Sequence, residues 1–266
     1  ARLAAERGVT MKLIGVTLLL AVSVLADPLT AQEKKPEVSL AGQSVRAVAL
    51  LYSQDESGGM RMRCTATAYD KTRHGYKFIS AAHCIGEDNL DKERAATGEN
   101  VPFFVTFDES KTVKKFHPAA VEWVGYQHRG EDFAELDVAT EETWAVVPLG
   151  DEKKLEAGAK ILNVASPLGL GIQIISGSIS SVFLDRPVIQ GDINWRGSML
   201  LSLATVGGGS SGSAVISEEQ RAIVGFLVGT IGGTNIVAIP VSKFKAVKKA
   251  IDGGTYKYWV KDAPAT

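Results

Sequence analysis

Residues 199–241 read MLLSLATVGGGSSGSAVISEEQRAIVGFLVGTIGGTNIVAIPV, and the pattern of this stretch recurs along most of the chain. Short apolar runs alternate with turns rich in Gly, Ser, Asn and charged residues. Each run has the length and the β-branched content that are typical of a strand. The stretch therefore predicts a series of β-strands, with the Gly- and Ser-rich segment 207–213 forming one of the turns between them.

Similar apolar runs occur upstream, and together they imply about a dozen strands. They include SVRAVALLY, CTATAYD, YKFISAA, VPFFVTF, AAVEWVGY, FAELDVAT, KILNVAS and IQIISGSISSVF. The close spacing of turn residues favours an all-β sandwich or barrel over alternating βαβ units. The charged segment 141–159 divides the runs into two similar groups, which predicts two packed barrels joined by a linker.

One segment near the C-terminus departs from the strand pattern. Phe244, Val247, Ala250 and Ile251 recur at helical spacing. Ser242 is the expected N-cap, and Gly253 or Gly254 the expected stop. We therefore expect a helix over about residues 242–252.

Composition and charge argue against nucleic acid as a partner. The 266 residues are 45% hydrophobic, and 29 Lys and Arg nearly balance 30 Asp and Glu. The charges are spread along the chain without a long basic block that would attract phosphates. The composition is that of an ordinary globular protein.

Residues 11–31 have the pattern of a secretory signal peptide. Met11 and Lys12 precede an apolar run over 13–25, and small residues offer cleavage after Ala26 or Ala31. The apolar run is shorter than the roughly 20 residues that a membrane-spanning helix needs. We expect export to the periplasm or the extracellular space, no stable membrane anchor after cleavage, and a polar linker over residues 32–44.

The chain contains two cysteines, Cys64 and Cys84. In an exported protein such a pair is expected to form a disulfide. The alternative is two buried thiols, which applies if the protein is not exported.

The segment FISAAHCIG, residues 78–86, ends an apolar strand with His83 and Cys84. A single histidine is weak evidence for catalysis, but this segment resembles the TAAHC signature of trypsin-like serine proteases. The resemblance implies that His83 is the general base and that Cys84 bonds to Cys64 on a preceding strand. A nucleophile in that family lies in a Gly-x-Ser-Gly turn, which GSSGS at 209–213 matches, with Ser211 as the attacking residue.

Two further parts of a protease site follow from this resemblance. Gly209, Ser210 and Ser211 would form the oxyanion hole, because a turn without a side chain at 209 can aim two backbone N–H groups at one point. Asp132 begins a segment similar to the strand that carries the family's acid, and we expect it to orient His83. The competing Asp137 lies inside the strand pattern and is expected to be a solvated carboxylate.

The resemblance is closest to HtrA/DegP-type proteases. NVASPLGLGIQIISGSISSV, residues 163–182, is similar to that family's Gly-Asn-Pro-Phe-Gly-Leu-Gly segment and the strand after it. The resemblance covers residues 45–252 and implies two six-stranded antiparallel barrels, over about 45–140 and 155–241, with the triad in the cleft between them. These relatives commonly carry a PDZ domain after the protease domain, and only residues 253–266 follow the expected helix, so peptide-gated regulation and caged assembly are not expected.

The expected activity is hydrolysis of proteins or peptides by an exported serine endopeptidase, through an acyl-enzyme and without a metal or organic cofactor. The alternative is a secreted binding protein that keeps the fold without catalysis. By the family pattern, the floor of the primary substrate pocket is Thr205, and its wall comes from Leu227, Val228, Gly229 and Thr230. An uncharged pocket predicts cleavage after Val, Ala or Leu.

Overall fold

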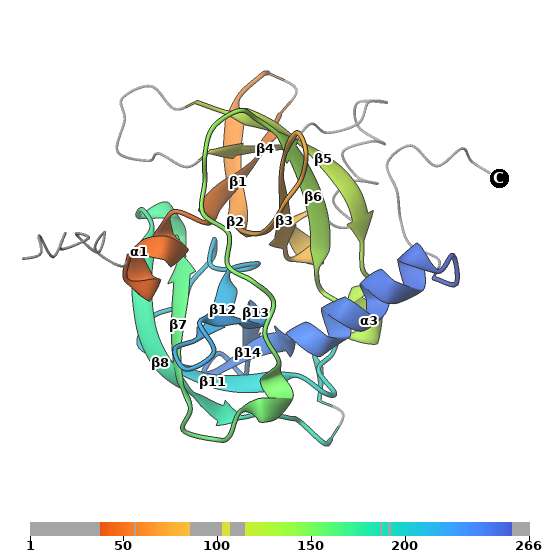
Figure 1. The fold of residues 1–266 in the computed structure, drawn as a ribbon. Coiled ribbons are helices and arrows are strands. Elements are labelled where there is room, and N and C mark those ends of the chain that lie inside the picture. The colour runs from red at the N-terminus through yellow and green to blue at the C-terminus, as the bar shows by residue number, and fades with distance from the viewer. Residues whose placement is uncertain are drawn as a thin grey trace, which may run out of the picture. The chain divides into compact units, whose positions relative to one another are not determined.

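The structure is a computed structural model that describes residues 38–55, 57–85, 103–106, 115–186, 188–190 and 193–256. The expected signal peptide, residues 11–31, and residues 32–37 of the expected linker lie outside the described residues. Within the described part, strands dominate, as the sequence predicts (Figure 1).

Six antiparallel strands close the first barrel in the spatial order β1-β2-β3-β6-β5-β4. They are β1 (Val48–Gln54), β2 (Met60–Lys71), β3 (Gly75–Ser80), β4 (Phe103–Thr106), β5 (His117–Val124) and β6 (Ala134–Ala139). Side chains of β5 alternate between buried and exposed over most of its length, which is the period-2 pattern of a strand with one face in a core.

The second barrel also consists of six antiparallel strands, in the order β11-β14-β13-β12-β7-β8. They are β7 (Lys160–Ala165), β8 (Gln173–Ser181), β11 (Met199–Leu203), β12 (Ala214–Ser217), β13 (Ala222–Ile231) and β14 (Asn235–Pro240). A short hairpin of β9 (Ile189–Gln190) and β10 (Ile193–Asn194) lies outside both barrels. The prediction of two six-stranded barrels is confirmed.

The N-terminal part of the described chain contains a helix that the strand pattern did not indicate. Helix α1 (Leu40–Val45) covers the end of the expected linker 32–44 and the beginning of the expected strand SVRAVALLY. Ser39 explains this start, since its hydroxyl accepts the N–H of Gly42 at 3.1 Å as an N-cap. The strand that follows begins only at Val48.

The predicted C-terminal helix is present as α3 (Val241–Asp252), with Gly253 as its C-cap. The prediction that Ser242 caps its N-terminus is wrong, because Pro240 holds that position and offers no side-chain hydrogen bond. The Ser242 N–H instead donates to the carboxylate of Glu152 at 3.1 Å. Glu152 lies in the 3-10 turn η3 (Glu152–Lys154), so the cap comes from a segment far away in the sequence. No helix in the described ranges combines the length and apolar character needed to cross a membrane.

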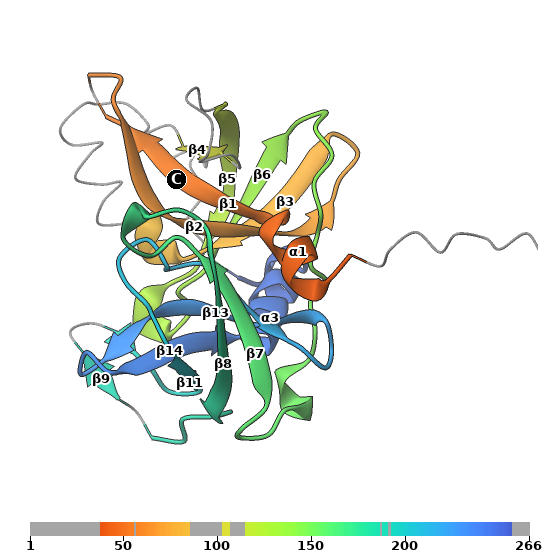
Figure 2. The same ribbon diagram turned by 90° about the vertical axis from the view of Figure 1, so that its left-hand side faces the viewer.

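Helix α3 packs against both barrels, and Figures 1 and 2 show its course from the end of β14. The fully buried ring of Phe244 contacts Tyr69, Trp123 and Phe133 of the first barrel, all with centroids 5.5 to 5.6 Å away. Its other neighbour is Phe226 in β13 of the second barrel, at 5.8 Å. This aromatic cluster joins the two barrels, because aromatic pairs at such distances add to the burial of apolar area.

A buried carboxylate adds a polar connection between α3 and the first barrel. Glu135 in β6 is 1% exposed and accepts hydrogen bonds from Lys248 of α3, Lys77 of β3 and the Tyr69 hydroxyl. Burial acts to raise the pKa of Glu135, but the three donors outweigh it and hold the pKa below its ordinary value. Glu135 is therefore a charged residue that is buried and paired with three donors.

Candidate active site

The sheet register of the first barrel brings His83 and Asp132 together. Strands β3 and β6 pair from Gly75 opposite Ala139 to Ser80 opposite Ala134. His83 lies just beyond Ser80, in the 3-10 turn η1 (Ala82–Cys84), and Asp132 lies just before Ala134. Because the two strands are antiparallel, the residues that follow one and precede the other meet at the same edge of the barrel.

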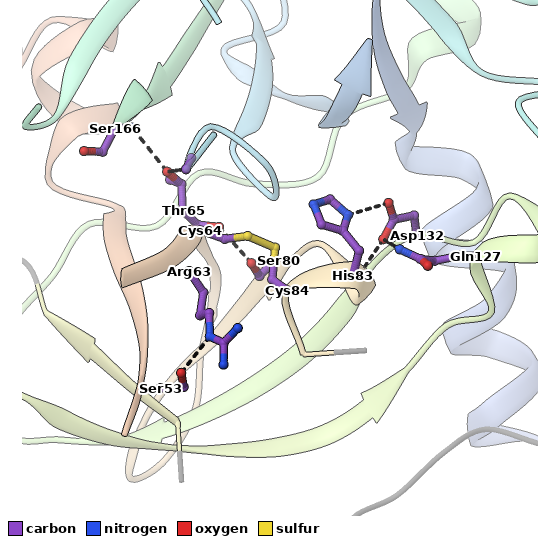
Figure 3. Close-up of a disulfide and its surroundings, with 11 residues drawn as sticks. Ser53, Arg63, Cys64, Thr65, Ser80, His83, Cys84, Gln127, Asp132 and Ser166 are labelled. Atoms are coloured by element: carbon purple, nitrogen blue, oxygen red, sulfur yellow. Dashed lines mark hydrogen bonds and ion pairs between the residues drawn. A yellow bond between two sulfur atoms is a disulfide. The ribbon is translucent and has the colours of Figure 1, made fainter. Parts of the chain in front are cut away.

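The Asp132 carboxylate is 1% exposed and accepts three hydrogen bonds (Figure 3). One oxygen accepts the backbone N–H of His83 at 2.9 Å and the side-chain amide of Gln127 at 3.3 Å. The other oxygen lies 2.7 Å from His83 Nδ1. A carboxylate has no proton to give, so His83 Nδ1 is the donor and Nε2 of the neutral ring keeps its lone pair.

Two opposing effects set the pKa of His83. Burial disfavours the charged imidazolium and acts to lower the pKa, while the charge and the hydrogen bond of Asp132 act to raise it. The aspartate prevails, and the pKa of His83 lies above its ordinary value of 6.5. The ring is neutral only on the alkaline side of that raised pKa.

Ser211 lies in the turn that leads from β11 into β12, and this turn is held against the first barrel. The Ser211 carbonyl accepts the N–H of Thr65 in β2 at 3.0 Å. Gly212 follows with φ +81°, and a Cβ there would lie 2.6 Å from the nitrogen of Ala81. Only glycine allows the backbone at 212 to lie so close to Ala81. This close approach places the serine turn against the segment that carries His83.

Two backbone N–H groups of this turn, those of Gly209 and Ser211, have no hydrogen-bond acceptor in the part of the chain that the structure describes. The carbonyl of each of these two peptide units is hydrogen-bonded. Gly208 O accepts the N–H of Leu168 at 2.6 Å, and Ser210 O accepts the N–H of Ser213 at 3.1 Å. The N–H groups of the same peptide units, from Gly209 and Ser211, have no acceptor among the described residues. Unpaired backbone donors next to a candidate nucleophile are the feature that an oxyanion hole requires.

The expected disulfide is present between Cys64 in β2 and Cys84 in η1, with Cα atoms 6.1 Å apart. It fixes the turn that carries His83 to the strand that contacts Ser211. Cys64, Cys84 and His83 are close enough together to be considered as metal ligands. Because the two sulfurs bond to each other, they offer no thiolates, and this cluster does not fit a metal site.

The expected pocket residues lie along two segments near the serine turn. Thr205 is exposed between β11 and the turn, while Leu227, Val228, Gly229 and Thr230 lie in β13. The Leu227 carbonyl accepts the N–H of Gly212 at 2.7 Å, and the Leu227 N–H donates to Ser213 at 2.9 Å. This strand is thereby fixed directly beside the turn that carries Ser211.

Two residues of the site were missed from the sequence. Gln127 comes from the 3-10 turn η2 (Gln127–Arg129), and nothing in the sequence links its amide to Asp132. Thr65 reads as an ordinary strand residue, yet its hydroxyl bonds the Gly209 carbonyl at 2.7 Å. Its position directly after Cys64 is the one signal that could have identified it.

Comparisons with solved structures show the same fold at low sequence identity. The crystal structure of Deg5 superposes with a TM-score of 0.60 at 16% identity, over 80% of this chain and 91% of that one. The HtrA-type protease AlgW with a tripeptide gives 0.59 at 16% identity, over 80% of this chain and 62% of that one. The same protease with a decapeptide gives 0.60 at 14% identity, over 82% and 67% of the two chains.

The sequence comparisons identify the family. A search of curated proteins gives no significant match. The family model of the trypsin-like peptidase domain matches residues 64–226, which is more than half of the chain and includes Cys64, His83, Asp132 and Ser211. With its two barrels and the paired His83 and Asp132, this chain belongs to the trypsin-like peptidase family.

Proposed function

We propose that this protein is an exported serine endopeptidase whose catalytic residues are Ser211, His83 and Asp132. His83 Nε2 takes the hydroxyl proton of Ser211 as its oxygen attacks a peptide carbonyl. Asp132 holds the ring in the required tautomer and stabilises the imidazolium that forms. An acyl-enzyme results, and water hydrolyses it in the second half of the reaction.

The observation that carries this proposal is that the N–H groups of Gly209 and Ser211 have no hydrogen-bond acceptor in the described part of the chain. Both N–H groups belong to the turn that carries Ser211, where they could donate to the oxyanion of the tetrahedral intermediate. A flexible Gly- and Ser-rich loop would not be expected to have its neighbouring carbonyls held while these two donors stay open. The peptide complexes of the HtrA-type protease AlgW support peptides as the substrate class.

Export is part of the same proposal. It rests on the signal-peptide pattern of residues 11–31 and is supported by the disulfide between Cys64 and Cys84. Disulfides persist in oxidising compartments such as the periplasm and are rare in the cytosol. Expression of the full chain in bacteria, followed by fractionation and N-terminal sequencing, tests both export and the cleavage site.

The alternative function is that of a secreted binding protein that has this fold but no catalytic activity. A fluorophosphonate probe separates the two, because it phosphonylates only a serine that is activated as a nucleophile. Mass spectrometry of the labelled protein should place the adduct on Ser211. Absence of labelling in the correctly folded, disulfide-bonded protein would favour the binding protein.

We expect the enzyme to cleave after small or medium aliphatic residues. Thr205, Val228 and Thr230 carry no charge, so a buried Arg or Lys side chain would find no ion-pair partner among them. Burying a Val or Leu side chain there would gain about 1.5 to 3 kcal/mol from removal of apolar surface from water. Profiling with a peptide library tests this, and a dominant preference for Arg or Lys would contradict the assigned pocket.

The raised pKa of His83 predicts the acid limb of the pH profile. The free base is needed for catalysis, so kcat/KM should fall as the pH drops through the pKa of His83. Because Asp132 raises that pKa, the half-maximal point should lie above pH 6.5. A profile of kcat/KM from pH 5 to 9 measures it, and a midpoint clearly below 6.5 would show that Asp132 does not act on the base.

A further inference from the structure

Thr65 is a buried residue of β2 whose side chain has no role in the mechanism derived so far. We propose that Thr65 is a positioning residue for the oxyanion hole, holding the Gly209–Ser210 peptide unit so that the N–H groups on either side face the substrate. The proposal rests on the proposed endopeptidase function and specifies what holds its transition-state site.

The hydrogen bonds of the Thr65 hydroxyl have a defined direction. The backbone N–H of Ser166 lies 3.2 Å from Thr65 Oγ1 and can only donate to it. The single hydroxyl proton is then available to the Gly209 carbonyl, 2.7 Å away. Figure 3 shows Thr65 between Ser166 and the disulfide, on the far side of the disulfide from His83.

Thr65 thereby connects one barrel with two segments of the other. Its N–H donates to the Ser211 carbonyl at 3.0 Å, its hydroxyl donates to Gly209, and the same oxygen accepts from Ser166. Ser166 begins the segment that leads into the 3-10 turn η4 (Pro167–Gly169). One residue of the first barrel therefore holds the serine turn at two points, Gly209 through its hydroxyl and Ser211 through its backbone N–H.

The Gly209–Ser210 peptide unit is the part of the turn where such a constraint matters. It lies between the N–H of Gly209 and the N–H of Ser211. A rotation of this unit would therefore turn one or both of these N–H groups away from the oxyanion. Gly209 has φ +93°, a conformation that glycine can also leave easily. The N–H of this unit, from Ser210, donates to the Gly207 carbonyl at 3.0 Å within the turn itself. The Thr65 hydroxyl bonds the carbonyl of the same unit and thereby ties it to the first barrel.

A second contact holds the neighbouring peptide unit and supports the same conclusion. Leu168 donates its N–H to the Gly208 carbonyl at 2.6 Å from a left-handed conformation, φ +57°. A leucine rarely adopts this conformation, so the surrounding chain imposes it. The unit before Gly209 is thus fixed by Leu168, and the unit after it by Thr65.

The Thr65→Val variant tests the proposal, because valine keeps the branched shape and lacks the hydroxyl. We expect kcat to fall about 10- to 100-fold with little change in KM, since an oxyanion hole acts mainly in the transition state, and loss of one whole donor costs about 100- to 1000-fold. Thr65→Ser, which keeps the hydroxyl, should restore most of the rate. If valine prevents folding, Thr65→Ala removes the hydroxyl without crowding.

Thr67→Val is the matched control. Thr67 is also fully buried in β2, on the same side of the strand, and its hydroxyl accepts the N–H of Ala214 at 3.3 Å. Thr65→Val removes two buried hydrogen bonds and Thr67→Val removes one, so the urea midpoint of each variant is measured to separate its loss of stability from its loss of kcat. Equal kcat values for Thr65→Val and Thr67→Val would overturn the positioning role and would show that Thr65 contributes only to stability.

A crystal structure of Thr65→Val provides a readout that does not depend on activity. We expect the Gly209 carbonyl to lose its partner and the Gly209–Ser210 unit to rotate, whereas an unchanged turn would refute the proposal. Fluorophosphonate labelling of the wild-type protein tests the endopeptidase function separately. An unlabelled wild type would contradict that function, and the crystal structure would still decide whether Thr65 holds the turn.

Discussion

Replacement of Ser211 by alanine should lower kcat by about a millionfold, close to the loss expected when the nucleophile of a Ser-His-Asp hydrolase is removed. The N–H groups of Gly209 and Ser211 stay in place in this variant, so a small residual rate above that of the uncatalysed reaction in water is expected from the oxyanion hole and substrate binding. Hydrolysis of a fluorogenic peptide with an aliphatic residue before the scissile bond measures the loss. Folding should be unaffected, because Ser211 is only half-buried.

Ser213→Ala serves as the control in the same turn. The Ser213 hydroxyl accepts from the side-chain amide of Asn163 at 2.8 Å in the barrel interior, so its loss should affect stability more than turnover. Loss of activity in Ser213→Ala with retention in Ser211→Ala would show that the nucleophile is misassigned. A double variant of Ser211 and His83 should be no slower than the single Ser211 variant, because nucleophile and base act as one unit.

The strands and the candidate base His83 could be predicted because their signals are local in the sequence. Apolar runs of strand length, separated by turn residues, carry the barrel pattern within short windows. The motif around His83 is contiguous, and so is the turn around Ser211. The disulfide was also predictable, since Cys64 and Cys84 are the two cysteines of the chain.

The features that the sequence did not predict depend on contacts between distant segments. Helix α3 is capped through Glu152, which lies 90 residues before Ser242. The buried Glu135 accepts hydrogen bonds from three separate elements, through Tyr69 of β2, Lys77 of β3 and Lys248 of α3. No window of the sequence contains such a set of partners.

The same limit applies to the part of the site around Thr65. Its hydroxyl bonds Gly209, which is 144 residues away, and Ser166, which is 101 residues away. A threonine in a strand is explained by β propensity, so its position directly after Cys64 is the one feature of the sequence that could suggest a further role. Sequence motifs identify the groups that react, whereas the structure is needed to identify the residues that orient them.

Asp132→Asn is expected to lower kcat about ten-thousandfold, the loss typical of removing the acid of such a triad. Both oxygens of Asp132 are acceptors here, one for the His83 and Gln127 N–H groups and the other for His83 Nδ1. Asparagine has only one acceptor oxygen, so its amide NH₂ would face His83 Nδ1 and favour the tautomer with the proton on Nε2. That nitrogen could then no longer accept the proton of Ser211.

Asp137→Asn is the matched comparison, because the same change of charge is made in the same segment. Asp137 lies within β6, is half-buried and pairs in the ladder with Lys77 and Ala120, so its carboxylate has no place in the His83 hydrogen bonds described here. The variant should keep kcat close to that of the wild type. Raising the pH should partly restore activity to Asp132→Asn, because hydroxide can take the proton that His83 no longer accepts. A larger loss in Asp137→Asn than in Asp132→Asn would move the acid of the triad to Asp137.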